Sequence, residues 1–285
     1  MTKILGHEDI IAVLKKSVDE KRTAHSYLFS GIEGIGKKLI AIEFACMLNC
    51  PAFSSIDHRN CKTCERIRKG IHADVRIEKP LKGSIRIDRV RQLQGFLKYS
   101  PIEAPYRVII LDDAHTINRP AQNALLKVLE EPPVNSILVL VTSKASALLP
   151  TVRSRLRRIK FPPLDRSVVA EELSRIKEIP QEEAMAIAGL SSGSLGHALE
   201  LLSTNTLKLR NSLTGFLSNA PDYGLAGLLE LSAQVSSEAP RLVEAIHFGM
   251  TWIRDLLLIR IGAPASFVVN TDLIDILKTS AQHYS

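Results

Sequence analysis

The hydrophobic residues in the first half of the chain fall into two alternating patterns. Apolar residues recur at helical spacing in four segments, which are residues 8–20, 39–48, 86–98 and 121–129. Short apolar runs with the length of buried strands lie between these segments, at residues 26–31, 108–111 and 136–142. Because strands that alternate with helices form parallel sheets with covered faces, the pattern predicts an α/β fold.

The pattern changes after the dipeptide Pro162-Pro163, and the rest of the chain is predicted to be helical. Three short helical runs break at Pro180 and at residues 191–194, and longer helices with apolar faces follow. We therefore predict an α/β domain, a small helical domain and a second helical domain, with the bounds 1–163, 164–207 and 208–285. The last domain is short, and whether it is truncated stays open.

Composition and charge narrow the class of protein. Of the 285 residues, 45% are hydrophobic and 24% are charged, as in ordinary folded proteins. No apolar run approaches the roughly 20 residues that cross a bilayer, and the charged N-terminal segment does not resemble a secretory signal peptide. The net charge of +7 is a mild basic bias, compatible with DNA or acidic partners. All four cysteines lie between Cys46 and Cys64, which favours metal binding in a reducing compartment and predicts a cytoplasmic protein.

A candidate phosphate-binding loop, GIEGIGKK, occupies residues 31–38, between a predicted strand and a predicted helix. The glycines Gly31, Gly34 and Gly36 allow backbone N–H groups to surround phosphate oxygens, and Lys37 supplies a positive charge. The next position is ordinarily Ser or Thr, whose hydroxyl binds magnesium, but here it is Lys38. A lysine cannot bind a cation in this way. The sequence therefore predicts a degenerate nucleotide site, and ATP binding is doubtful.

Acidic and polar residues follow the next two predicted strands. Asp112 and Asp113 end the strand at 108–111, where one acid would hold magnesium and the next would orient the attacking water. Asp113 is one methylene shorter than the glutamate that usually orients the water. Thr142 and Ser143 end the strand at 136–142, where a hydroxyl would be placed to reach a γ-phosphate. Without the upstream loop, each group would be an ordinary polar strand end.

The segment PTVRSRLRRIKF, residues 150–161, is strongly basic. Such a run is usually a solvated surface. Arg155, in the Ser154-Arg155 dipeptide, has a second interpretation, as an arginine finger that neutralises transition-state charge in a neighbouring subunit.

The cysteine-rich segment has the spacing C-x7-H-x2-C-x2-C, which is typical of a structural zinc site. The candidate ligands are Cys50, His58, Cys61 and Cys64. Of these, His58 is the weakest candidate, and His72 is an alternative. Cys46 lies one helical turn before Cys50 on an apolar helix face, so we interpret it as a core residue.

Taken together, these segments resemble a known family. The segments that carry the resemblance are HSYLFSGIEGIGKK, the cysteine loop, GIHADV (70–75), VIILDDAHTINRPAQNALLKVLEEPP (108–133), TVRSR (151–155) and GSLGHAL (193–199). In this order they resemble bacterial clamp-loader subunits, which are AAA+ proteins, and among them the delta-prime type. The resemblance covers essentially the whole chain.

The resemblance implies an AAA+ α/β domain with a zinc-module insertion at about 50–74, followed by a helical lid and a helical collar. It implies a hetero-oligomer with the gamma/tau and delta subunits of DNA polymerase III. This assembly uses ATP to open a sliding clamp and close it on primed DNA. The resemblance implies no membrane partner. Delta-prime-type subunits are generally its rigid stator, whereas gamma/tau subunits bind and hydrolyse ATP.

Residue by residue, the resemblance makes Arg155 the arginine finger that acts in trans on a neighbour's ATP. It makes Cys50, Cys61 and Cys64 zinc ligands, with His58 in place of a fourth cysteine. The chain departs from active relatives at Lys38, at Asp113 and at Gly196, where they carry an arginine that senses the γ-phosphate. These departures predict a subunit of the DNA-directed DNA polymerase holoenzyme that itself lacks ATPase activity.

Two alternatives to the stator hypothesis remain. The chain could be an active gamma- or replication-factor-type ATPase subunit, which ATPase assays on the isolated chain would identify. It could also be a zinc-bearing DNA-binding module with a decayed nucleotide fold, which would bind DNA tightly by itself with a steep salt dependence.

Overall fold

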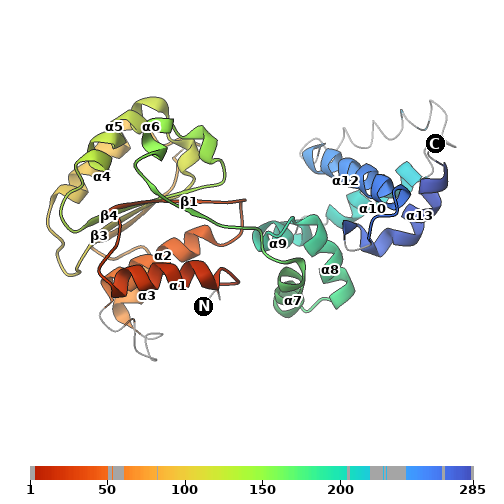
Figure 1. The fold of residues 1–285 in the computed structure, drawn as a ribbon, viewed down its shortest axis with the longest axis horizontal. Helices are drawn as coiled ribbons and strands as arrows, with labels where there is room; N and C mark the ends of the chain where they lie inside the picture. Colours follow the sequence, from red (N-terminus) through yellow and green to blue (C-terminus); the bar gives the residue numbers. More distant parts are fainter. Residues whose placement is uncertain are drawn as a thin grey trace. The chain divides into compact units, whose positions relative to one another are not determined.

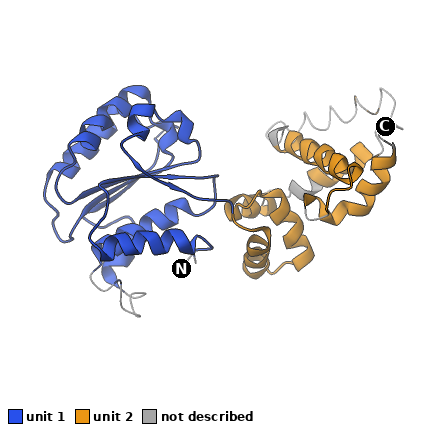
Figure 2. Ribbon diagram, in the orientation of Figure 1, with its two compact units in different colours: residues 1–163 blue, residues 164–285 orange. Residues whose placement is uncertain are grey.

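The structure, a computed structural model, describes residues 4–50, 53, 61–81, 83–203, 206–218, 227, 229, 242–264 and 267–283. The chain divides into two compact units, residues 1–163 and 164–285 (Figure 2). Each unit is described separately below.

The first unit is built on a five-stranded parallel sheet. Its strands are β1 (Ser26–Ser30), β2 (Val75–Glu78), β3 (Arg107–Leu111), β4 (Ser136–Thr142) and β5 (Arg157–Lys160), in the order β2-β3-β4-β1-β5. Every residue of β3 and β4 is buried, which explains why these strands are continuous apolar runs in the sequence. The predicted α/β fold with a parallel sheet is confirmed.

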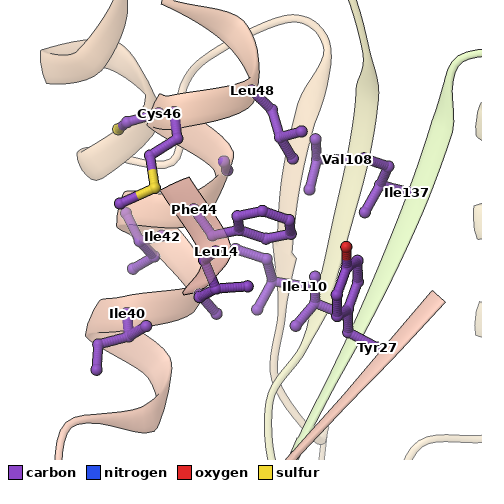
Figure 3. Packing of buried hydrophobic residues seen from close by; sticks show 14 of the residues in the cluster. Leu14, Tyr27, Ile40, Ile42, Phe44, Cys46, Leu48, Val108, Ile110 and Ile137 are labelled. Atoms are coloured by element: carbon purple, nitrogen blue, oxygen red, sulfur yellow. The ribbon is translucent and has the colours of Figure 1, made fainter. Parts of the chain in front are cut away.

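Helices cover both faces of the sheet (Figure 1). One face carries α1 (Glu8–Asp19), α2 (Lys37–Asn49) and α3 (Lys62–Arg68), and the other carries α4 (Ile87–Lys98), α5 (Arg119–Glu130) and the short α6 (Pro150–Arg153). Successive strand residues point to opposite faces, so β1 serves two cores. Phe29 packs in the cluster with Phe44 of α2, while Leu28 packs in the cluster with Leu125 of α5. Figure 3 shows the first cluster, in which Tyr27 and Phe44 lie between helix and sheet.

Two strands, β2 and β5, and two helices, α3 and the short α6, of this unit were not predicted from the sequence. β2 and β5 are the edge strands of the described sheet. β5 lies within the basic segment 150–161 and pairs with β1. Charged side chains are common on edge strands, where they prevent pairing with other chains. Helix α3 lies within the segment 50–74 and buries Cys64 and Ile67, too few apolar residues to show a helical period.

The second unit contains only helices in its described parts. They are α7 (Arg166–Lys177), α8 (Gln181–Leu190), α9 (Leu195–Ser203), α10 (Thr206–Ser218), α12 (Leu242–Arg260) and α13 (Ile274–His283). As predicted, Pro180 and residues 191–194 separate α7, α8 and α9. One apolar cluster joins these three helices to Leu213 of α10 and Phe248 of α12.

Polar contacts also join α7 to the segment between α12 and α13. The Arg166 guanidinium, at the start of α7, donates to the backbone oxygens of Val268 and Val269, at 3.2 and 3.1 Å, and to the Thr271 hydroxyl. The domain boundary near residue 207 stays a prediction. No helix in the described part of the chain is long and apolar enough to cross a membrane.

Candidate functional site

The glycine-rich loop connects β1 to α2, as the motif requires. Gly34 and Gly36 have φ angles of 75° and 93°, in the left-handed region that side chains disfavour. Gly36 is the residue before α2, so the first backbone N–H groups of the helix face the loop with no helical partner. Together with the helix dipole, this arrangement is suited to bind an anion.

Gly31 is required for a different reason, which is close packing. A Cβ atom at this position would lie 2.6 Å from the backbone oxygen of Phe161 and 2.8 Å from the side chain of Ile35. The Phe161 N–H donates to the oxygen of Ser30 at 2.7 Å, so the chain after β5 is fixed against the loop. Only a residue without a side chain fits here.

Lys37 is folded back into the loop. Its ammonium donates to the backbone oxygen of Gly31 at 2.8 Å and to that of Ile32, and the side chain is buried. Burial lowers the pKa of Lys37, an effect opposed by the charges of Glu33 and Asp112. The positive charge that the motif requires therefore lies inside the loop.

Lys38, which replaces the magnesium-binding hydroxyl, pairs with the acid that would hold the metal. The Lys38 Nζ lies 2.9 Å from Asp112 Oδ2, with the two side chains 29% and 15% exposed. The other oxygen of Asp112 accepts the backbone N–H of Asp113 at 3.2 Å. Asp113 has a φ of 48°, and its carboxylate accepts no hydrogen bond from any residue that the structure describes. The structure thus brings the loop and the first acid of the β3 end together.

The end of β4 lies beside the same loop, because the N–H of Gly31 donates to the oxygen of Thr142 at 3.4 Å. The Thr142 side chain is buried, and its hydroxyl accepts the N–H of Lys144 at 3.1 Å. A role for Thr142 or Ser143 toward a γ-phosphate stays a prediction.

Arg155 follows α6 and is held at the surface by local contacts. Its guanidinium lies 2.8 Å from the carboxylate of Glu130, at the end of α5, and donates to the oxygen of Thr151 at 2.9 Å. The Arg155 and Glu130 side chains are 39% and 50% exposed. The guanidinium is thus oriented but accessible.

Three of the predicted metal ligands lie together. Cys50 follows α2, Cys61 precedes α3 and Cys64 lies within α3, and their sulfur atoms are within 4.8 Å of one another. The Cys50 and Cys61 sulfurs are 3.3 Å apart. Tetrahedral zinc with bonds of about 2.3 Å places its sulfur ligands roughly 3.8 Å apart, so the donor set fits a zinc ion.

The pKa values of the thiols are shifted in opposite directions within this cysteine cluster. The backbone N–H of Cys64 lowers the pKa of Cys61 to about 7, whereas burial raises the pKa of Cys64. Cys46 does not join the cluster. It lies on the buried side of α2, where burial raises its pKa to about 12.

The fourth ligand is not settled by the described residues. His58 lies outside them. His72, the alternative ligand, does not join the cluster. Its Nδ1 accepts the backbone N–H of Asp74 at 3.1 Å, and its Nε2 lies 3.6 Å from a carboxylate oxygen of Glu103. His72 therefore has a structural role rather than a ligating one.

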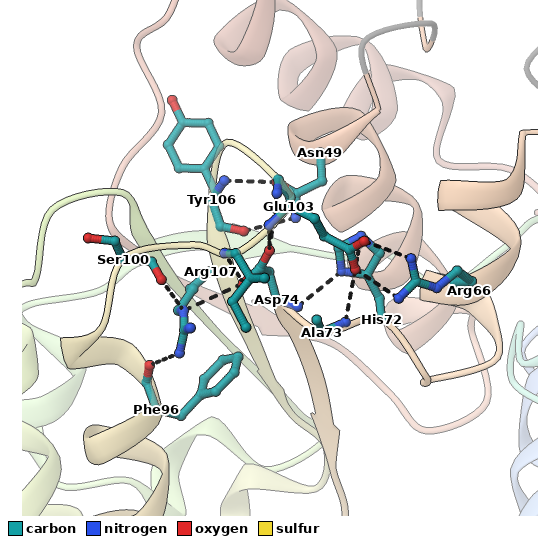
Figure 4. Close-up of polar contacts among 12 residues, drawn as sticks. Asn49, Arg66, His72, Ala73, Asp74, Phe96, Ser100, Glu103, Tyr106 and Arg107 are labelled. Atoms are coloured by element: carbon teal, nitrogen blue, oxygen red, sulfur yellow. Dashed lines mark hydrogen bonds and ion pairs between the residues drawn. The ribbon is translucent and has the colours of Figure 1, made fainter.

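A buried polar network surrounds His72, and it was not predicted from the sequence (Figure 4). The Asp74 carboxylate accepts the backbone N–H groups of residues 102, 103 and 104 and lies 3.6 Å from Arg107. Glu103 also pairs with Arg66 of α3, which connects the helix that carries Cys64 to this network. The motif GIHADV contributed to the family resemblance, but the residues that His72 and Asp74 contact are distant in the chain.

Comparison with known proteins gives the family. Residues 6–165 match the family described as DNA polymerase III, delta subunit, which is more than half of the chain. The chain belongs to the clamp-loader subunits of bacterial DNA polymerase III. A variant of RuvB from Thermotoga maritima is a solved structure of similar fold, which aligns with a TM-score of 0.50 at 15% identity over 85% of each chain. At this identity the likeness shows the fold alone.

Curated clamp-loader relatives carry gamma and tau names. The tau subunit of Bacillus subtilis is 29% identical over 90% of this chain and 49% of its own length. The gamma subunit of Buchnera aphidicola from Schizaphis graminum is 30% identical over 74% of this chain and 61% of its own length. The chain thus spans about half to three fifths of these relatives. Their names do not support the expectation that ATP binding is doubtful, so that question depends on the loop itself.

Proposed function

We propose that the chain is a subunit of the DNA polymerase III clamp loader, and that it joins gamma/tau and delta subunits in one hetero-oligomer. In this assembly it helps to load the sliding clamp onto primed DNA at the expense of ATP. Family membership, the AAA+ fold and the names of the relatives support this function.

Within the assembly, we propose a delta-prime-type role in which the chain does not hydrolyse ATP. The main observation in support of this role is the ion pair between Lys38 and Asp112. It occupies the acid that would hold magnesium, and no hydroxyl is present at position 38 to complete the metal site. The shorter Asp113 replaces the acid that orients water.

Arg155 would then act on a neighbour's ATP. Its guanidinium is permanently charged and lies at the surface. Its contact with Glu130 is half exposed, and such pairs contribute only about 0.2–1 kcal/mol. A phosphate of a neighbouring subunit can therefore replace Glu130 at low cost.

The second unit offers a surface for assembly on α12. Large apolar side chains on this helix are more than half exposed and recur three or four residues apart, as on one helix face, at Ile246, Met250, Ile253 and Leu257. An exposed apolar stripe of this kind is typical of an interaction site. We assign it to packing against the helical domains of other clamp-loader subunits.

We further propose that the cysteine cluster holds one structural zinc ion, with His58 as the fourth ligand. The ion would connect the end of α2 to α3 and fix the inserted segment. Elemental analysis of protein purified without chelator should find about one zinc per chain, and its absence would refute the site.

Reconstitution tests the function as a whole. The chain is mixed with gamma/tau and delta subunits and separated by size-exclusion chromatography, and one stable complex should elute that contains all of them. Failure to join any complex would refute the proposal. The matched control omits this chain, so that the stoichiometry of the remaining complex is compared directly.

A second candidate is an active gamma/tau-type ATPase, and the relatives' names together with the formed glycine loop favour it. The two candidates differ in the isolated chain. An active subunit should turn over ATP at about 1 s⁻¹ or faster, within the range of ordinary enzymes. A delta-prime-type subunit should show no turnover that depends on Lys37.

A further inference from the structure

The helix that follows the glycine loop begins with two lysines, Lys37 and Lys38, and only the first is part of the phosphate-binding motif. We propose that the Lys38 ammonium replaces the magnesium ion, so that the loop binds a nucleoside diphosphate or triphosphate as the free anion and not as its magnesium complex. This inference extends the proposed function, in which the site does not hydrolyse ATP.

The first argument is the coordination that remains for a metal. Each oxygen of the Asp112 carboxylate already has a partner, Lys38 at 2.9 Å for one and the N–H of Asp113 at 3.2 Å for the other. Magnesium requires oxygen ligands in a near-octahedral shell at about 2.0–2.1 Å. An ammonium group offers only donors. A metal at Asp112 would therefore have to compete with the Lys38 ammonium for the same carboxylate.

The second argument is charge. A metal ion at this place neutralises the carboxylate and the phosphates together. Lys38 already neutralises the carboxylate, and a divalent cation placed beside its ammonium would be repelled. The ammonium still has donors available, since Asp112 is its only ion-pair partner among the described residues. Those donors can face a phosphate oxygen.

The third argument is that the rest of the loop is formed for an anion. Gly34 and Gly36 adopt the left-handed backbone that opens the loop, and α2 starts directly behind it. The Lys37 ammonium donates to loop carbonyls and can transfer a hydrogen bond to an entering phosphate. Lys37 and Lys38 together then supply two cationic groups where an active site uses one lysine and one metal.

Equilibrium binding of ADP and ATP to the full chain tests the proposal, measured by calorimetry in excess EDTA and in excess magnesium. The unmodified chain should bind both nucleotides in EDTA, and magnesium should not tighten binding. Lys38→Thr restores a hydroxyl and frees Asp112, so binding should become at least about tenfold tighter with magnesium than without. Lys38→Met, which removes the charge at similar length, should weaken binding in EDTA.

Lys16→Met is the matched control, because Lys16 is an exposed lysine of α1 that pairs with Glu20, and it should leave binding unchanged. The proposal is overturned if the unmodified chain binds about tenfold more tightly with magnesium, or if it binds neither nucleotide in either condition. These measurements on the unmodified chain remain decisive if a Lys38 variant does not fold. Assembly with gamma/tau and delta subunits does not depend on this result, so failure here is distinguishable from failure of the proposed function.

Discussion

Replacement of Asp74 by alanine should strongly destabilise the first unit. The Asp74 side chain is fully buried, and its carboxylate accepts three backbone N–H groups at 2.8, 2.8 and 3.1 Å. These bonds hold the segment that enters β3, where Arg107 lies 3.6 Å away. The side chain thus anchors the loop between α4 and β3 to the start of β2.

The loss in the free energy of unfolding can be worked out from the backbone N–H groups and the Arg107 side chain that lose the Asp74 carboxylate. Hydrogen bonds to a charged group contribute about 1.5–3 kcal/mol each, but the loop at residues 102–103 is exposed, so water will partly replace the carboxylate. At about 1 kcal/mol for each of three bonds, the loss is about 3 kcal/mol. Arg107, itself buried, adds to this loss, and removal of one partner of a buried pair costs about 3–5 kcal/mol.

Urea denaturation followed by far-UV circular dichroism measures this loss, because the only tryptophan, Trp252, lies in the second unit and its fluorescence does not report on the sheet directly. Asp74→Asn keeps one acceptor oxygen and should lose less than Asp74→Ala. Asp19→Ala is the matched control, since Asp19 is exposed at the end of α1, and it should change stability by no more than about 0.5 kcal/mol. If Asp74→Ala matches this control, the network does not stabilise the unit.

Further predictions concern the loop, the cysteine cluster and pH. Gly31→Ala should destabilise the first unit by about 1–3 kcal/mol in the same denaturation assay, because the new Cβ would overlap the backbone oxygen of Phe161. Cys61→Ser should lower the zinc content measured by elemental analysis, because it removes one of three clustered thiols. Burial lowers the pKa of His72 below its ordinary value of 6.5, so the unfolded state takes up this proton first and the free energy of unfolding should fall as pH drops below about 6.5.

Each of these predictions has a control variant in the same chain. Gly95→Ala, in the middle of α4 with open space around it, should stabilise by about 0.5–1 kcal/mol, so equal effects at both glycines would contradict the packing argument. Cys46→Ser should keep the zinc, and its loss there would place the site elsewhere. His72→Gln should flatten the acid dependence of unfolding, and an unchanged pH profile would assign that dependence to another group.

Among the strands of the first unit, the sequence predicts those that are buried on both sides. β3 and β4 are continuous apolar runs because helices cover both of their faces. β2 and β5 carry charges such as Arg76 and Arg158 because they lie at the sheet edges, and their sequences therefore lack that pattern. Burial on one face of a short edge strand leaves too few apolar positions to recognise.

In the candidate site, too, some features are predictable from the local sequence and others depend on segments that are distant in the chain. The glycine loop is predictable because its spacing reflects local backbone geometry, and the position of Lys38 follows from the same motif. The pairing of Lys38 with Asp112 is not predictable, because it depends on which strand lies behind the loop. The Asp74 network depends on the register between separate elements, which no local pattern records.

The measurement that tests the central claim most directly is DNA-stimulated ATP hydrolysis by the assembled clamp loader that contains Arg155→Ala. An arginine finger contributes about 10³–10⁵ at one site, and since other sites continue to work, the total rate should fall clearly but by less than this factor. The complex should still assemble, because the half-exposed pair with Glu130 stabilises the fold by only about 0.2–1 kcal/mol. Arg155→Lys should also slow hydrolysis, since one ammonium cannot reproduce the planar guanidinium. Arg157→Ala, which removes an exposed arginine two residues away, should leave the rate unchanged. An unchanged rate with Arg155→Ala, or equal loss with Arg157→Ala, would contradict the account.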